Sequence, residues 1–207
     1  KAAMRRTAKV MEAHGAEAAA FRPDPPEAAV LFMRDSYVYS WLARHWHNVR
    51  HSAPNRFLAY PKTLERLNVP YEIHDDRHLP ESFGSLKLVL APNPEGLDDG
   101  AAEWLVRFAE SGGTVFVEGA AGAFGPDTFW RLPNDRPFYR RIGLAEDLHR
   151  RATQERRVIP AGAMGNGEPI DILLDECEAS FRQGQEGVTC LAPDGLPMMA
   201  NVKVGRG

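Results

Sequence analysis

Between residues 28 and 117, short apolar runs alternate with segments whose apolar residues recur at helical spacing. Continuous apolar runs of strand length are typical of parallel strands that are covered on both faces. The runs that we interpret as strands are residues 28–33, 71–74, 86–90 and 114–117. The helical patterns between them predict an α/β domain, a doubly wound parallel sheet with helices on both faces.

Three helices are predicted between these strands. The first spans residues 37–49, with an apolar stripe of Val38, Leu42, Trp46 and Val49. The second ends at residues 62–67, with Pro61 at its first turn or kinking it. The third begins after the acidic residues 98–99, which suit the positive end of a helix, and ends at the glycine pair 112–113.

The two ends of the chain have a different texture. Residues 1–14 predict a helix with Met4 and Met11 on one face and Gly15 as its cap. Prolines at 23–26 then form a stiff linker, so we divide the chain into 1–27, from a preceding domain, and 28–207. Residues 156–160, 170–181 and 188–204 predict strands without long helices, with a turn at 193–195. We interpret them as a C-terminal β extension, either antiparallel or an edge hairpin.

Composition narrows the range of partners. The formal net charge is −3 with 26% charged residues, so the chain has no basic surplus for nucleic acid. No apolar run reaches the length of a membrane span or forms a secretion segment, and we expect no membrane contact and a cytoplasmic location. Cys177 and Cys190 have no metal spacing, and buried free thiols are favoured over a disulfide. We expect no metal and no cofactor.

The fourth strand runs into a turn of small residues, Glu118-Gly119-Ala120-Ala121-Gly122. A sharp turn of small residues after a strand is how a nucleophile elbow is built. The nucleophile position is Ala120, whose methyl group has no nucleophilic chemistry. The segment is therefore either a degenerate nucleophile elbow, formed by Glu118, Gly119, Ala120 and Gly122, or an ordinary tight turn.

The order of elements resembles the class I glutamine amidotransferase fold, a flavodoxin-like arrangement in which this strand ends in Gly-x-Cys-x-Gly. A closer resemblance is to the amidotransferase-like middle domain, or trimerisation domain, of the β-galactosidases of glycoside hydrolase family forty-two. The stretches that carry it are AAVLF at 28–32, LERLNVPYEIHD at 64–75, LKLVLAP at 86–92, LVRFAESGGTVFV at 105–117 and LPMMANVKVGRG at 196–207. A short helix at 138–143 also fits. The chain departs from the family in its less polar turn after the fourth strand and its histidine-rich aromatic helix, so a related, uncharacterised glycosidase-like family is the alternative.

This resemblance implies that the catalytic acid and nucleophile lie on a separate barrel domain. We therefore expect no catalytic residue in this chain. It implies a homo-oligomer, a trimer in the family, and a catalytic barrel as partners. Glycoside hydrolysis needs two carboxylates flanking the bond, and Glu118 is the one with a suggestive position here. We interpret Glu118 instead as a turn cap or as the partner of an arginine. The run of His74, Asp75, Asp76 and His78 has no recognised metal-ligand spacing and reads as a solvated loop.

An aromatic and histidine-rich segment follows the first strand. Its candidate residues are Asp35, Tyr37, Trp41, His45 and Trp46. Aromatic side chains pack against the apolar faces of sugar rings, and Asp and His side chains form hydrogen bonds with sugar hydroxyl groups. The segment therefore suits one wall of a carbohydrate site. The simplest interpretation is helix core for Trp46 and interdomain packing for Trp41, and an oligomer contact is the remaining alternative.

Two functions remain open. The first is a non-catalytic structural and oligomerisation domain of a β-galactosidase-like glycoside hydrolase. The second is a freestanding amidotransferase-like module that binds a small ligand. The turn after the first strand, residues 33–37, has no glycine to cradle a phosphate, which weakens nucleotide or flavin binding.

Overall fold

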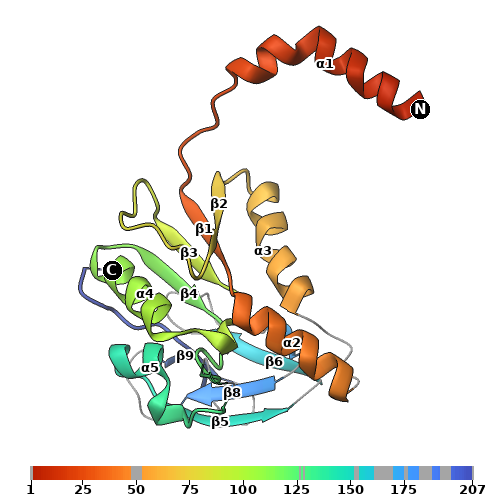
Figure 1. Ribbon diagram of the computed structural model, residues 1–207. Helices are drawn as coiled ribbons and strands as arrows, with labels where there is room; N and C mark the ends of the chain where they lie inside the picture. Colours follow the sequence, from red (N-terminus) through yellow and green to blue (C-terminus); the bar gives the residue numbers. More distant parts are fainter. Residues whose placement is uncertain are drawn as a thin grey trace.

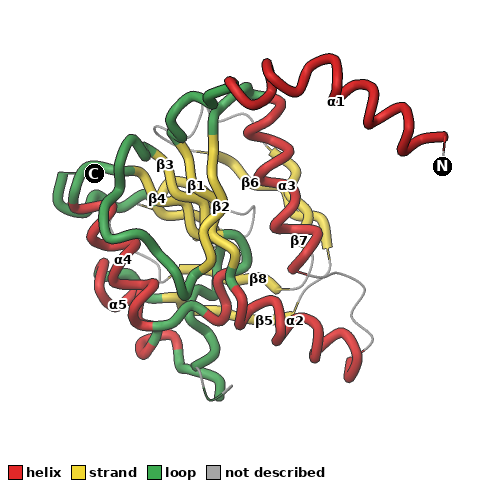
Figure 2. The backbone as a smooth tube through the Cα atoms, turned by 45° about the horizontal axis from the view of Figure 1, so that its top comes forward, coloured by secondary structure: helices red, strands yellow, loops and turns green. Residues whose placement is uncertain are grey.

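A computed structural model gives the fold of the chain (Figure 1). It describes residues 2–47, 53–125, 127, 129–151, 154–160, 170–174, 177–181, 188–191 and 197–206. A parallel sheet with helices on both of its faces occupies the middle of the sequence, and antiparallel strands follow it (Figures 1 and 2).

The parallel sheet has the strand order β2-β1-β3-β4. All three neighbouring pairs are parallel. The strands are β1 (Ala28–Phe32), β2 (Tyr71–Asp75), β3 (Leu88–Ala91) and β4 (Thr114–Val117). The α/β fold predicted from the apolar runs is confirmed. Both ends of each strand lie within two residues of the predicted ends.

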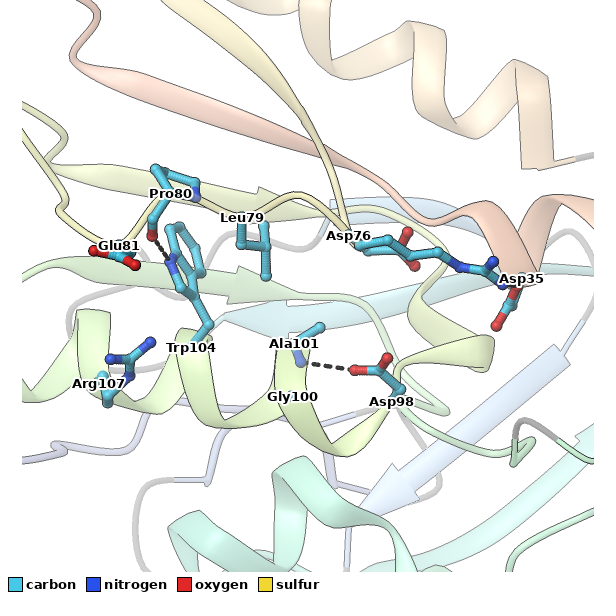
Figure 3. A pocket seen from close by; sticks show the side chains of 11 residues that line it. Asp35, Asp76, Leu79, Pro80, Glu81, Asp98, Gly100, Ala101, Trp104 and Arg107 are labelled. Carbon is cyan, nitrogen blue, oxygen red and sulfur yellow. Dashed lines mark hydrogen bonds and ion pairs between the residues drawn. The ribbon is translucent and has the colours of Figure 1, made fainter.

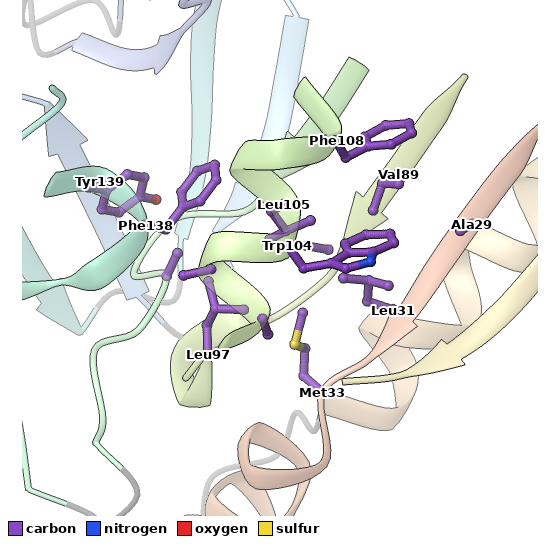
Figure 4. Close-up of a cluster of buried hydrophobic side chains, with 14 of the residues drawn as sticks. Ala29, Leu31, Met33, Val89, Leu97, Trp104, Leu105, Phe108, Phe138 and Tyr139 are labelled. Atoms are coloured by element: carbon purple, nitrogen blue, oxygen red, sulfur yellow. The ribbon is translucent and has the colours of Figure 1, made fainter. Parts of the chain in front are cut away.

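Successive residues of β1 serve two different cores because side chains alternate between the faces of a strand. Ala28 and Val30 face the smaller cluster with Leu64 of α3 (Ala53–Arg66). Ala29 and Leu31 face the larger cluster, built on α4 (Asp99–Glu110) and α5 (Pro137–Ile142) (Figure 4). In this cluster the rings of Trp104 and Phe108 stack with centroids 6.0 Å apart. Covering both faces explains why the strands are continuously apolar.

Helix α4 begins as its sequence predicts. The Asp98 carboxylate accepts a hydrogen bond from the Ala101 N–H at 2.7 Å, which satisfies one of the free amides of the first turn. Helix α5 confirms the short helix expected at 138–143. Helix α3, in contrast, begins at Ala53, so Pro61 lies in its interior and not at its first turn.

The apolar stripe predicted for α2 (Arg34–His47) is wrong in its described part. Val38 is 52% exposed and Leu42 is 40% exposed, whereas Ser36 and Ser40 are buried. The serines face the short 3-10 helix η1 (Pro94–Gly96), and Ser36 Oγ accepts the Gly96 N–H at 2.8 Å. A Cβ on Gly96 would lie 2.7 Å from the Ser36 nitrogen, so small side chains are needed at this contact. The side chain of Trp46 and the whole of residue 49 lie outside the described residues.

Helix α1 (Ala2–Ala20) does not end at Gly15, which is a further correction. One glycine costs a helix about 1 kcal/mol, and the alanines and Glu17 that follow favour continuation. The helix projects away from the sheet (Figure 1), and Met4 is 77% and Met11 59% exposed. The assignment of residues 1–27 to a preceding domain remains a prediction. Among the described residues, no helix combines the length and the apolar character that a membrane span requires.

The C-terminal third forms two antiparallel sheets, one ordered β10-β9-β6-β7 and one pairing β5 with β8. The strands are β5 (Glu146–Arg151), β6 (Gln154–Pro160), β7 (Ile170–Leu174), β8 (Cys177–Phe181), β9 (Val188–Leu191) and β10 (Pro197–Ala200). The antiparallel alternative is therefore the right one: in the described part of the chain, no ladder joins these strands to the parallel sheet. Strand β5 was not predicted. The strand predicted at 170–181 is divided into β7 and β8, and the strand predicted at 188–204 is divided into β9 and β10. The turn at 193–195 and the thiols of both cysteines lie outside the described set.

Candidate functional site

The turn after β4 contains two residues with a positive φ, a backbone conformation that is unusual for residues other than glycine. Ala120 has φ 64° and Gly122 has φ 71°. A positive φ costs an L-residue about 1–2 kcal/mol, so surrounding contacts must hold Ala120 in place. Its methyl group is fully buried against Ala123, Phe124 and Tyr39. The side chain at the nucleophile position thus enters an apolar cluster.

The chain does not enter a helix after this turn, as it would at a nucleophile elbow. In the described residues between 118 and 132, the one element of regular secondary structure is an isolated β-bridge between Phe124 and Trp130. The next helical element is η2 (Pro133–Asp135). Gly122 closes the turn, since its N–H reaches Pro94 O at 2.8 Å and an added Cβ would lie 2.9 Å from Pro137 Cδ.

Glu118 is occupied by structural hydrogen bonds. Its Oε1 accepts the Tyr60 hydroxyl at 2.6 Å, and its Oε2 accepts the Asn93 N–H at 2.6 Å. Asn93 follows β3 and also has a positive φ, 47°. Glu118 therefore ties α3 and the end of β3 to the end of β4. Both carboxylate oxygens serve this junction, which suits a turn cap better than a catalytic acid.

A buried ion pair lies behind the turn. The side chains of Arg136 and Glu146 are both fully buried and pair with each other. Glu146 Oε1 also accepts the Ala120 N–H at 2.7 Å. The Arg136 guanidinium lies 5.2 Å from the centre of the Trp130 ring, at cation–π distance. Sequence reasoning missed this pair because two charges ten positions apart, outside any motif, carry no signal that they meet.

The predicted aromatic segment does not converge on one point in its described part. Asp35 pairs with Arg77, and the Tyr37 ring packs at 5.2 Å on Phe32. Trp41 is 57% exposed and lies near Val38 on the helix surface. The side chains of His45 and Trp46 are outside the described residues. Among the described side chains of this segment, Trp41 is therefore an exposed aromatic residue.

A hollow of about 550 Å³ lies at the carboxyl ends of β1 and β2, where open α/β sheets commonly bind ligands (Figure 3). Polar residues that line it include Asp35, Asp76, Arg77, Asp98 and Arg107. They come from the start of α2, the loop after β2, and α4 with its cap. The hollow gathers carboxylates and guanidinium groups around one space.

Two adjacent carboxyl groups at the end of β2, Asp75 and Asp76, have opposite pKa shifts. Burial raises the pKa of Asp76 from 3.8 to about 6, and the nearby carboxylates of Asp75 and Asp35 add to the rise. The hydrogen bond from Arg34 lowers the pKa of Asp75 to about 2, helped by the backbone N–H of Arg77. Asp75 is therefore committed to arginine. Across the described residues, no three His, Cys, Asp or Glu side chains are grouped as metal ligands.

Comparison with known proteins gives a fold but no family assignment. No protein-family model matches the chain, and no curated protein matches its sequence. Among solved structures, it is similar to the cold-adapted β-galactosidase from Rahnella sp. R3, with a TM-score of 0.74, 16% identity, and coverage of 88% of this chain and 28% of that one.

Two further structures place that similarity in context. A GH42 β-galactosidase from G. stearothermophilus matches with a TM-score of 0.69 and 15% identity, over 88% of this chain and 26% of that one. An exo-β-1,4-mannosidase from Opitutaceae bacterium strain TAV5 matches with a TM-score of 0.54 and 17% identity, over 88% and 30%. The chain spans less than a third of each of these proteins. It thus has the fold of one part of larger glycoside hydrolases.

Replacing Glu146 tests the buried pair. Glu146→Gln leaves the Arg136 charge buried without a counter-charge, and we expect a loss of about 3–5 kcal/mol in the free energy of unfolding. Glu27→Gln is the matched control, because Glu27 pairs with Lys87 at the surface and should cost less than about 1 kcal/mol. Urea unfolding measures both. Equal small losses would contradict the anchoring role of Glu146.

The raised pKa of Asp76 predicts a pH dependence of stability. A carboxyl group with a higher pKa in the folded state favours folding when protonated, so stability should fall as pH rises from about 4 through about 6. Asp76→Asn should remove that fall. Asp75→Asn should instead remove a stability loss that occurs below pH 3.8, because the pKa of Asp75 is lowered. NMR titration and unfolding at each pH measure these effects; an unchanged profile in Asp76→Asn would refute the assignment.

Proposed function

We propose that the chain is a non-catalytic structural and oligomerisation domain of a β-galactosidase-like glycoside hydrolase. The observation that carries the proposal is the exposed apolar surface of α2. Val38, Trp41 and Leu42 are 52%, 57% and 40% exposed and stand three and four residues apart, on one side of the helix. We call these three residues the α2 face.

Helix α2 is linked through Tyr39 to a second exposed apolar segment. Tyr39 of α2 packs on Phe124 with ring centroids 3.7 Å apart, and Phe124 packs on Trp130 at 4.9 Å. Around Trp130, Phe129 is 75% and Leu132 is 65% exposed. Large exposed apolar patches mark interaction sites, and tryptophan and tyrosine carry much of the energy of protein interfaces.

The turn after β4 supports a role without catalysis. Ala120 supplies no nucleophile, and its methyl group is buried beneath Tyr39. Both oxygens of Glu118 are held by Tyr60 and Asn93. The residues with the most suggestive positions therefore serve the junction between strands.

The similarity to parts of β-galactosidases supports the choice of partner. In those proteins the matched region is about a quarter of the chain, so we propose that a catalytic barrel and further copies of the same protein cover the α2 face. A trimer is the assembly that we expect. Helix α1 fits this proposal, since nearly all its described side chains are exposed and helices in proteins draw most of their stability from packing against a partner.

A second function is favoured by the hollow near Asp76. A freestanding module that binds a small polar ligand would use this position, beyond the carboxyl ends of the strands. Its charged lining suits hydroxyl or amine groups. No residue of the α2 face lines this hollow, so the two functions are separable by mutation.

Analytical ultracentrifugation of the wild-type chain and of Trp41→Ala tests the proposal. We expect concentration-dependent association of the wild type, weakened about tenfold or more in Trp41→Ala, because truncating a buried tryptophan at an interface costs more than about 1.4 kcal/mol.

Leu67→Ala is the matched control. Leu67 is 66% exposed and follows α3, outside the α2 face, so this variant should associate like the wild type. A wild type that stays monomeric at the highest concentration reached would contradict self-assembly through the α2 face. Equal weakening by both variants would show that the contact is unspecific.

A further inference from the structure

The parallel sheet ends in two edge strands of opposite character. Its order makes β2 and β4 the outer strands. Strand β2 carries Glu72, His74 and Asp75, and charged side chains on an edge discourage the addition of another strand. Strand β4 reads Thr-Val-Phe-Val without a charge. It has none of the charged residues that would protect its edge.

The backbone on the outer side of β4 is free to pair within the described part of the chain. Strand β4 forms one ladder, with β3, over Thr114–Val117. The further backbone bonds at its two ends, from Thr114 N to Lys87 O and from Glu118 N to Ala91 O, also lead toward β3. An edge strand with free N–H and C=O groups is a template for one more strand.

A hollow of about 400 Å³ lies beside the same strand. Val115 and Val117 form one wall, α4 and α5 contribute Val106 and Ile142, and residues 200–204 lie opposite. Most of the residues that line it are apolar, and several of these side chains are partly buried against the core. A cavity of about 150 Å³ can hold a benzene ring, so this one has room for about two or three apolar side chains.

The hollow and the free edge match one kind of occupant. Val115 and Val117 point to the face with the hollow, while Phe116 points to the other face and is 39% exposed. A strand added beside β4 would direct every second side chain into the hollow, because side chains alternate along a strand. The charged residues lining the hollow are Lys203 and Arg206, both basic. They favour acidic residues at one end of the added strand.

We propose that β4 accepts a further β-strand from a partner domain, with apolar side chains at alternate positions and acidic residues beside Lys203 and Arg206. A second copy of this chain is a poorer occupant. Its own β4 would bring the same basic residues to the contact and would leave both hollows unfilled. This interaction surface is separate from the α2 face and does not rest on the proposed function, since no residue of α2 lines the hollow.

A synthetic peptide of about eight residues, within the usual range of strand lengths, tests the proposal with the whole chain. It alternates valine and threonine and ends in two glutamates. Fluorescence anisotropy measures its binding, and hydrogen exchange reports on the backbone. Binding should slow exchange at residues 114–117 and leave the β2 edge, residues 71–75, unchanged.

Two N-methylated versions of the peptide separate strand pairing from simple apolar contact. Methylation of the amides on the edge that pairs with β4 should weaken binding about tenfold or more, since backbone bonds are lost. Methylation on the opposite edge should leave binding unchanged. Equal binding of both versions would overturn strand addition and would indicate an apolar ligand site instead.

Charge variants of the chain identify the rim. Lys203→Glu with Arg206→Glu should weaken binding of the glutamate peptide, and replacing its glutamates by lysines should restore binding to this variant. Arg107→Glu is the control, because Arg107 is an exposed base of α4 that lines the other hollow. No binding of any peptide, or slowed exchange at 114–117 through self-association alone, would refute the proposal.

Discussion

The buried pair of Arg136 and Glu146 is the contact on which the carboxyl edge of the sheet depends. Two charges removed from water are costly unless each meets the other and further polar groups. Glu146 meets this requirement by holding the Ala120 N–H as well as Arg136, whose guanidinium lies over Trp130. One carboxylate thereby fixes a positive-φ residue, the segment that carries Trp130 and the start of β5. The position of the exposed aromatic residues around Trp130 follows from this anchor.

The turn at this edge shares two backbone features with a nucleophile elbow, a strand end and a left-handed residue, Ala120. It differs from an elbow because no helix follows it in the described residues before η2, and Gly122 lies against Pro137 instead. The methyl group of Ala120 enters an apolar cluster, and the nearest strand-end carboxylate, Glu118, is bonded on both oxygens. The exposed apolar side chains near this edge lie on α2 and around Trp130.

The sequence predicted the parts of the fold in which local pattern and burial agree. Continuous apolar runs located β1 to β4 because both faces of the sheet are covered, and Asp98 marked the start of α4. The prediction that an apolar stripe buries α2 was wrong because the contact with η1 is made by Ser36 and Gly96. The small size of these two residues decides the packing. The Arg136–Glu146 pair could not be predicted for a different reason. The strength of this ion pair depends on the burial of both side chains, and a single sequence does not show which charged residues are buried. Trp41 lies off the predicted stripe, yet its exposure is shared by Val38 and Leu42 of that stripe, which spacing alone could not predict.

Turnover measured on the purified chain most directly tests whether the turn after β4 is a structural junction. Wild type and Glu118→Gln are assayed with a panel of aryl glycosides and with glutamine, with circular dichroism to verify folding. A junction without a nucleophile predicts no turnover above the uncatalysed rate in either protein. Robust hydrolysis of an aryl glycoside by the wild type, lost in a folded Glu118→Gln variant, would contradict it and would make Glu118 a catalytic carboxylate.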